Sequence, residues 1–440
     1  MTVHAPHRPK PFEKRKLADW TVLAYFAGDN NLEGALLEDL NEMEAVGSRP
    51  GSVEILAQID RAPGYDHSNG DWATTRRYYV TRGADRRKIT SKLLADLGET
   101  DTGDPKVLED FIRFGARNFP AKACALILSN HGSGFYVPPA MLSRACAPSR
   151  RELATRAMPR LRRSLFHTSR QRLLDLEPDR RGVAYDDSSA DCLDNRELKR
   201  VLQDAHQAFG RKVDLVGMDA CLMTMLEVVY QIRDHAQVLV GSEEVEPGAG
   251  WPHDLILRDL TARPAMPSAE LATTVVRRYV ESYQGTGQEA TQSAIDLSKL
   301  DDLVEAAVDA LARRLLAAIP SPALEAALHA AWRRTLRFFD NMYVDLHHFA
   351  GNLTAATDVR AIKRACADVQ RAIEGRGAKS PILAEGHVGA RMQSARGLSI
   401  YFPPFRDPSA FYRELDFARR TRWEEFIEAY LGSGRAGAAR

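Results

Sequence analysis

The sequence predicts an α/β fold in which a mostly parallel central sheet is flanked by helices. Several short segments are apolar at nearly every position, as strands are when both faces of their sheet are covered. Amphipathic segments lie between them, which is typical of repeated strand–helix units. The 440 residues are too many for one small core, so we expect either two or three structural units or one large elaborated domain.

The elements follow one another in a regular order along the first 300 residues. Apolar, strand-like runs occupy 20–28, 52–60, 123–130, 212–220, 237–244 and 290–297. The segment 75–83 alternates weakly, which indicates an edge strand or a hairpin arm. Helical periodicity appears at 32–46, after a turn rich in Asp and Asn, and again at 106–119.

Composition divides the chain into four parts. Residues 1–18 are polar and basic and are expected to form a disordered tail, and 19–300 form the α/β domain. An Ala- and Leu-rich region, 301–390, is expected to be helical. In 391–440 we expect a late strand at 397–404, and then a C-terminal helix that packs back on the α/β domain.

The segment 137–182 breaks the strand–helix pattern. It contains eleven arginines against four acidic residues and has no clean periodicity. It is either a solvated basic insertion or an exposed loop that a protease cuts after arginine. If this protein is that protease, the insertion is an activation linker.

Composition also limits the partners and the compartment. The net charge of +1 gives no reason to expect nucleic acid or an anionic membrane. The N-terminus lacks the apolar stretch of a secretory signal, and no run is long enough to span a membrane, so we expect a cytoplasmic protein. The cysteines are odd in number and contain no C-x-x-C pair, which argues against a disulfide framework and a zinc ribbon. They are Cys124, Cys146, Cys192, Cys221 and Cys366.

Reactive side chains follow two of the predicted buried strands. His131 comes directly after 123–130, and Cys221 comes directly after 212–220. The residues beyond Cys221 have helical spacing, so we expect Cys221 at or near a helix N-terminus, where the helix dipole favours thiolate. A thiolate and a histidine are the minimum for cysteine acyl transfer. Alternatively, Cys221 is a small buried hydrophobe and His131 is a surface or capping residue.

The glycine after the histidine has a role in this chemistry. Gly132 has no Cβ, so its backbone can approach a substrate closely. The carbonyl oxygen of an attacked peptide bond becomes negative, and backbone amides must point at it. We therefore expect the amides of Gly132 and Cys221 to form the oxyanion site.

At these residues the sequence resembles the clostripain family of cysteine peptidases, peptidase family C11 of clan CD. The resemblance implies a caspase-like (caspase-hemoglobinase) fold and carries the catalytic histidine to His131 and the catalytic cysteine to Cys221. It covers about residues 20–404 and is interrupted by the basic insertion. The motifs that carry it are WTVLAYFAGDNNLE, LILSNHGSGF, GVAYDDSSADCLDNRELKRVL, VDLVGMDACLMTMLEVVYQI, GSEEVEPGAGWPH and RGLSIYFPP.

The resemblance implies cleavage after Arg or Lys, through a thioester acyl-enzyme. The S1 acid of the family carries over to Asp219, where a buried carboxylate could take a bidentate bond from a guanidinium. The alternative for Asp219 is a helix N-cap. Glu243, Glu244 and Glu246 are weaker candidates for the same pocket, and the alternative for them is a solvated loop. The expected partners are therefore proteins or peptides with a basic P1 residue, and the oligomeric state is open.

Members of the family are often matured by internal cleavage between the histidine and cysteine segments, where 137–182 lies. Some depend on calcium. The motifs DNNLE and YDDSSAD contain enough oxygen donors for a weak site, but neither has EF-hand spacing, so we expect no required cofactor and no defined metal site. Two alternatives to a peptidase stay open: an inactive caspase-like scaffold that uses the insertion for docking, and nucleic-acid binding through the insertion.

Overall fold

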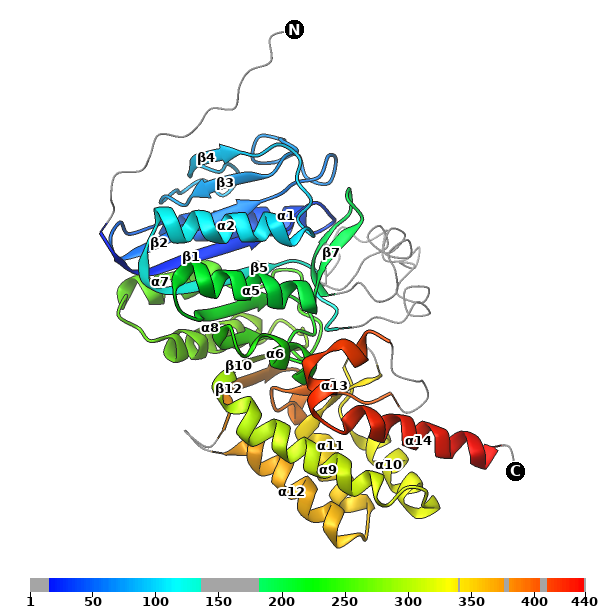
Figure 1. Ribbon diagram of the computed structural model, residues 1–440. Helices are drawn as coiled ribbons and strands as arrows, with labels where there is room; N and C mark the ends of the chain where they lie inside the picture. The colour runs from blue at the N-terminus through cyan, green and yellow to red at the C-terminus, as the bar shows by residue number, and fades with distance from the viewer. Residues whose placement is uncertain (1–15, 136–181, 339–340, 376–379, 404–409, 439–440) are drawn as a thin grey trace.

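The computed structural model describes residues 16–135, 182–338, 341–375, 380–403 and 410–438. At its centre lies a nine-stranded sheet with the strand order β12-β10-β9-β8-β5-β1-β2-β3-β4 (Figure 1). Most of the expected tail, 1–18, and nearly all of the basic insertion, 137–182, lie outside the described residues. In the part of the chain that is described, no helix combines the length and the apolar composition that crossing a membrane requires.

The middle of the sheet is parallel, as the sequence predicts. Its strands are β1 (Ala18–Phe26), β2 (Val53–Ile59), β5 (Ala121–Ser129), β8 (Val213–Asp219) and β9 (Ala236–Gly241). Antiparallel strands extend it at both sides, and these are β3 (Arg76–Tyr79), β4 (Lys92–Asp96), β10 (Ala290–Asp296) and β12 (Ile382–Val388). The segment 75–83 is the inner arm of a hairpin, since β4 covers its outer edge.

Helices cover both faces of the sheet because the strands bury both faces. Along β1, Leu23 and Tyr25 join one hydrophobic core, whereas Val22, Ala24 and Phe26 join the other. The first core is covered by α2 (Pro105–Asn118), α5 (Asn195–Phe209) and α6 (Leu226–Ile232). The second is covered by α1 (Glu33–Val46), α7 (His253–Ala262) and α8 (Ser268–Tyr283).

The region 301–390 contains helices and also two strands that the sequence analysis does not predict. Its helices are α9 (Ala306–Leu316), α10 (Pro322–Arg334), α11 (Leu346–Ala356) and α12 (Arg360–Glu374). The strand β12 joins the edge of the central sheet, and its residues are only partly buried, so it lacks the apolar run that marks the inner strands. The late strand, β13 (Ser399–Tyr401), pairs with β11 (Tyr343–Asp345) in a separate two-stranded sheet. A further hairpin is formed by β6 (Gly182–Asp186) and β7 (Asp191–Asp194).

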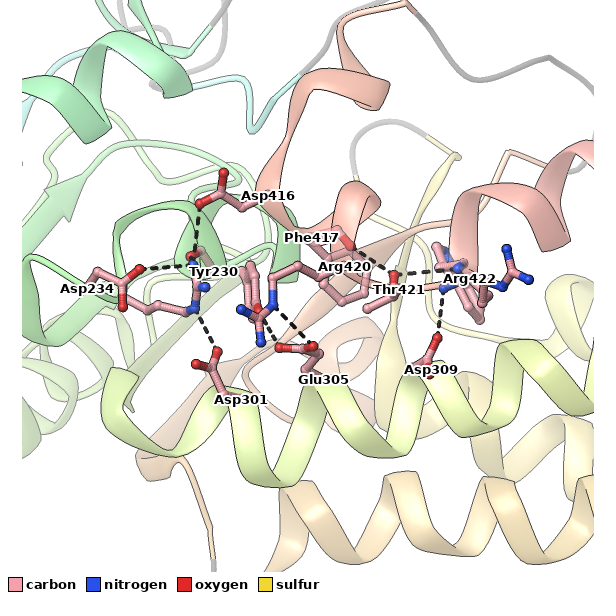
Figure 2. A network of polar contacts seen from close by, with 12 residues as sticks. Tyr230, Asp234, Asp301, Glu305, Asp309, Asp416, Phe417, Arg420, Thr421 and Arg422 are labelled. Atoms are coloured by element: carbon pink, nitrogen blue, oxygen red, sulfur yellow. Dashed lines mark hydrogen bonds and ion pairs between the residues drawn. The ribbon is translucent and has the colours of Figure 1, made fainter.

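Ion pairs tie the C-terminal helices, α13 (Asp416–Arg420) and α14 (Trp423–Ala438), to the rest of the molecule (Figure 2). Arg233, at the end of α6, donates to Asp301 at 2.6 Å, and one of its terminal nitrogens lies 3.4 Å from Asp416. Arg420 donates to Glu305 at 3.3 Å. The Arg233 side chain is only 7% exposed, and its contact with Asp416 links α6 to α13.

Candidate active site

The two predicted reactive residues lie at the same edge of the sheet. The strands β5 and β8 are parallel neighbours, and Ser129 stands opposite Asp219 in their register. His131 and Cys221 each lie two residues beyond that pair. Parallel strands present their carboxyl ends at one edge, so the topology alone brings the histidine and the cysteine together.

Gly132 joins the two segments. A Cβ atom at this position would lie 2.3 Å from the carbonyl oxygen of Cys221 and 2.8 Å from its nitrogen. The backbone after the histidine is therefore packed directly on the peptide of the cysteine, which requires glycine. This contact puts the two amides predicted for the oxyanion site on adjoining segments.

The His131 ring is held from the loop after β1. Its Nε2 atom lies 2.8 Å from Oδ1 of Asn31, and the residue is fully buried. Since Oδ1 is an acceptor, Nε2 carries the proton in this contact. With Nε2 protonated in this way, Nδ1 is the nitrogen that would take up a proton during a reaction, and Asn31 orients the ring.

The environment of the Cys221 sulfur differs from the prediction in one respect. The helix α6 begins at Leu226, and Leu222 has a φ of 65°, so a sharp turn separates Cys221 from the helix. Cys221 therefore lies five residues before the helix and not at its N-terminus, because Leu222, Met223 and Met225 continue the core without forming a helical turn. In place of a helix dipole, the amide of Glu246 donates to Sγ at 3.2 Å, a contact that favours thiolate.

Asp219 is wholly buried beneath the cysteine. Its Oδ2 atom accepts a hydrogen bond from the Ser129 hydroxyl at 3.1 Å and lies 3.3 Å from Nε2 of His253. Burial tends to lower the pKa of His253, but the bond to Asp219 and the charges of Asp39, Asp219 and Glu42 outweigh it, so the pKa is raised. Asp219 does not cap α6, which begins seven residues later.

The three glutamates have different surroundings, and all are buried rather than on a solvated loop. Glu243 accepts a bond from the Gly397 amide at 2.8 Å, and Glu244 forms an ion pair with Arg391. Both contacts are to the C-terminal part of the chain. Glu246, in contrast, contacts the Cys221 sulfur through its backbone amide.

A protein-family model matches most of the chain. The model of the clostripain family, a family of C11 peptidases, matches residues 24–149 and 170–430. The chain belongs to the clostripain family. The unmatched residues between these two blocks fall within the basic insertion, where the sequence analysis expects an interruption.

Individual relatives agree with this placement. Clostripain from Hathewaya histolytica is 30% identical over 269 residues, which cover 57% of this chain and 43% of that protein. The match therefore spans less than half the length of that curated relative. A secreted C11 cysteine protease from Bacteroides thetaiotaomicron, in complex with an irreversible peptide inhibitor, has a TM-score of 0.58 at 18% identity. An inactive zymogen C11 protease from Parabacteroides distasonis has a TM-score of 0.58 at 17% identity.

These two structural matches cover 92% of this chain and 99% of each protease, and at such identities they show a shared fold. The predicted α/β fold with a mostly parallel sheet, of the clostripain-family type, is therefore confirmed.

Sequence reasoning missed three residues that lie beside the candidate site, Asn31, His253 and Tyr279. Asn31 lies in the Asp-Asn turn after β1, which only its polar composition marks. Tyr279, on α8, is buried, and its pKa is raised by burial and by the nearby charges of Glu246, Asp219 and Cys221. His253 and Tyr279 are far from Cys221 in the sequence, so no local spacing could have indicated them.

Proposed function

We propose that the chain is a cysteine endopeptidase that uses Cys221 as nucleophile and His131 as the proton-transferring residue. The observation that carries the proposal is the contact between Gly132 and the Cys221 peptide at neighbouring strand ends. This contact supports the proposal because acyl transfer needs a nucleophile, a base and backbone amides close to one another.

The reaction would proceed in two stages. In the first, Nδ1 of His131 takes the proton of the Cys221 thiol, Sγ attacks the carbonyl carbon of the scissile bond, and a thioester forms when the C–N bond breaks. His131 delivers a proton from Nδ1 to the departing amine. In the second, His131 takes a proton from water, and the oxygen of that water attacks the thioester carbonyl. The C–S bond then breaks, the carboxylic acid leaves, and His131 returns the proton to Sγ of Cys221.

The surroundings of the two side chains support these roles. Asn31 leaves Nδ1 of His131 as the exchanging nitrogen, and the Glu246 amide stabilises the anionic sulfur. The Gly132 and Cys221 amides would bind the oxyanion that forms at each stage. Each such donor contributes about 3–4 kcal/mol to the stabilisation of a transition state in related chemistry.

We extend the proposal to cleavage after Arg or Lys. Two acidic residues near Cys221 support a preference for a basic P1 residue. Asp219 lies two positions before Cys221, and the backbone amide of Glu246 contacts the Cys221 sulfur. Glu243 and Glu244 are weaker candidates, because their carboxylates bind Gly397 and Arg391. Asp219 has no exposed surface, so a guanidinium would have to replace its contact with Ser129 or His253.

Self-cleavage within 137–182 is a further part of the proposal. Cys221 and His131 have no exposed surface in this conformation, so a peptide reaches the sulfur only after a rearrangement. Cleavage at one of the eleven arginines would be such an event. Wild type is expected to give two fragments, whereas Cys221→Ala stays as one chain. A wild-type chain that remains intact after long incubation, with and without calcium, would count against self-cleavage alone.

The central test is hydrolysis of fluorogenic peptides that end in Arg, Lys, Ala or Asp. We expect wild type to prefer Arg and Lys, and we expect Cys221→Ala and His131→Ala to lose activity by at least about 1,000-fold. Cys366→Ala, at a buried cysteine of α12, is the matched control and should retain activity. Equal hydrolysis by wild type and Cys221→Ala would refute the assignment. A folded wild type that neither cleaves nor is labelled at Cys221 would favour the inactive scaffold.

The cytoplasmic location stays a proposal as well. No disulfide is formed among the described cysteines, as in a reducing compartment. The Bacteroides thetaiotaomicron relative is described as secreted. Fractionation of the native cells would decide, because finding the chain outside the cell would contradict the cytoplasmic location.

A further inference from the structure

A buried histidine lies beside the proposed S1 acid. His253 is the first residue of α7, and its side chain is only 1% exposed. Its Nε2 atom lies 3.3 Å from Oδ2 of Asp219, on β8, and 4.0 Å from Oδ2 of Asp39, on α1. Both carboxylates are buried as well, so the ring lies between two acids that have almost no exposed surface.

His253 brings positive charge to these acids. Carboxylate oxygens accept hydrogen bonds, so Nε2 is the donor in its contact with Asp219. Burial by itself lowers the pKa of His253, but the bond to Asp219 and the charges of Asp39, Asp219 and Glu42 outweigh burial and raise the pKa above 6.5. The ring is therefore mostly charged at pH 6.5, and it balances part of the negative charge around it.

A carboxylate in the position of Asp219 needs a positive neighbour if it is to attract a substrate cation. Burial disfavours the charged form of a carboxylate, whereas an opposite charge within about 4–6 Å favours it. The ionised form is the one that binds a guanidinium or ammonium group strongly. The Ser129 hydroxyl also donates to Oδ2 of Asp219, at 3.1 Å, but it carries no charge and so does not offset burial as an imidazolium does.

The other titratable groups around this pair are acids, a phenol and a thiol. They are Asp39 and Glu42 on α1, Asp254 on α7, Tyr279 on α8, and Cys221 and Glu246 at the strand ends. Glu42 accepts a bond from the His253 amide at 3.0 Å, and burial and the charge of Asp39 raise its pKa to about 7. All of these groups are neutral or negative near neutral pH, whereas His253 is positive.

We propose that His253 is a positioning residue of the S1 site, which keeps Asp219 ionised so that the enzyme binds a basic P1 side chain. The inference rests on the proposed peptidase function and on Asp219 as its S1 acid. Asp39 has a part in it, because it offers Nε2 of His253 a second acceptor when a guanidinium takes over the bond to Asp219. The imidazolium then pairs with Asp39 while the substrate cation pairs with Asp219, so neither buried charge is left unpaired.

The test compares two fluorogenic peptides, one ending in Arg and one in citrulline, which has nearly the same shape but no charge. The ratio of their kcat/KM values isolates the effect of that charge, since titration of Cys221 and His131 affects both peptides alike. We expect the full wild-type chain to prefer Arg by at least about 100-fold, evenly between about pH 6 and about pH 8. His253→Gln should lower the ratio at least about tenfold at about pH 7, through a higher KM for the Arg peptide, and the preference should return as the pH is raised to about 9. A purely structural role of His253 would instead lower the cleavage of both peptides together.

His347→Gln is the matched control, because His347, on α11, also pairs with a carboxylate, that of Glu374 at 2.7 Å. It should leave the ratio unchanged. A folded His253→Gln that keeps the wild-type ratio would overturn the role of His253 alone.

Circular dichroism checks that His253→Gln folds. If it does not, the wild-type profile decides, because a ratio that climbs steadily between about pH 6 and about pH 8 would mean that Asp219 is uncharged there in spite of His253, and would overturn the proposal. Wild type that cleaves both peptides equally would overturn Asp219 as the S1 acid, and the role of His253 with it. Wild type that cleaves neither peptide would refute the peptidase itself.

Discussion

Gly132→Ala is the sharpest perturbation of the proposed active site. The added Cβ would lie 2.3 Å from the carbonyl oxygen of Cys221, whereas an ordinary contact is 3.4–4 Å. The two segments must therefore separate by about 1 Å, and backbone atoms on both sides leave no flexible side chain to yield. A misplacement of this size at a reacting centre costs about 100-fold in rate.

The same substitution should change stability only slightly. Overpacking costs about 1–3 kcal/mol. At about 2.1 cal/mol/K per residue, unfolding of the 440-residue chain changes entropy by about 0.9 kcal/mol/K, so Tm should fall by about 1–3 °C. The expected result is thus a large loss of kcat/KM in a chain that remains folded.

The assay is hydrolysis of an Arg-ended fluorogenic peptide, with Tm measured on the same preparations. Gly432→Ala is the control, because a Cβ at that exposed helical position meets no atom within 4 Å. It should leave both activity and Tm unchanged. The reasoning is refuted if Gly132→Ala keeps more than half of the wild-type kcat/KM, since the contact would then not position the reacting groups.

Two further predictions test other parts of the molecule. Asn31→Ala should lower kcat about tenfold with little change in KM, because the His131 ring loses its orienting contact. Asn31→Asp should restore activity and move the acid limb of the pH profile to higher pH. An unchanged kcat in Asn31→Ala would argue against this role of Asn31. Burial raises the pKa of Glu227 to about 7 from 4.5, so its stabilising contribution is complete below pH 4.5 and is lost as pH rises to 7. The loss is about 3 kcal/mol, so Glu227→Gln should raise Tm by about 3 °C at pH 8 and leave it unchanged at pH 4. The prediction is contradicted if calorimetry gives the variant the same Tm as wild type at both pH values.

Local pattern was sufficient for the inner part of the fold. The apolar runs that became β5 and β8 predicted buried strands, and the polar residues that follow them were expected where the sheet ends. That is why His131, Gly132 and Cys221 could be chosen before their positions were known. The edge strand β12 escaped because partial burial leaves no such run.

Pattern was misleading directly after the nucleophile. Helical spacing begins at Leu222 and continues through Met225, Leu226 and Val229, yet the helix begins at Leu226, because burial in the core can be satisfied by a turn as well as by a helix. The dipole expected at Cys221 is replaced by the amide of Glu246, a contact between residues 25 positions apart.

The sequence by itself determined which side chains reach the carboxyl edge of the sheet, because alternation and apolar runs depend on neighbouring residues. Only the tertiary structure decided what those side chains meet. Glu244 is bound by Arg391, 147 positions away, whereas Glu246 touches the sulfur. Asp29 and Asp60 come together because β1 and β2 lie side by side. Such contacts depend on how strands are ordered in the sheet, and no periodicity within one segment contains that order.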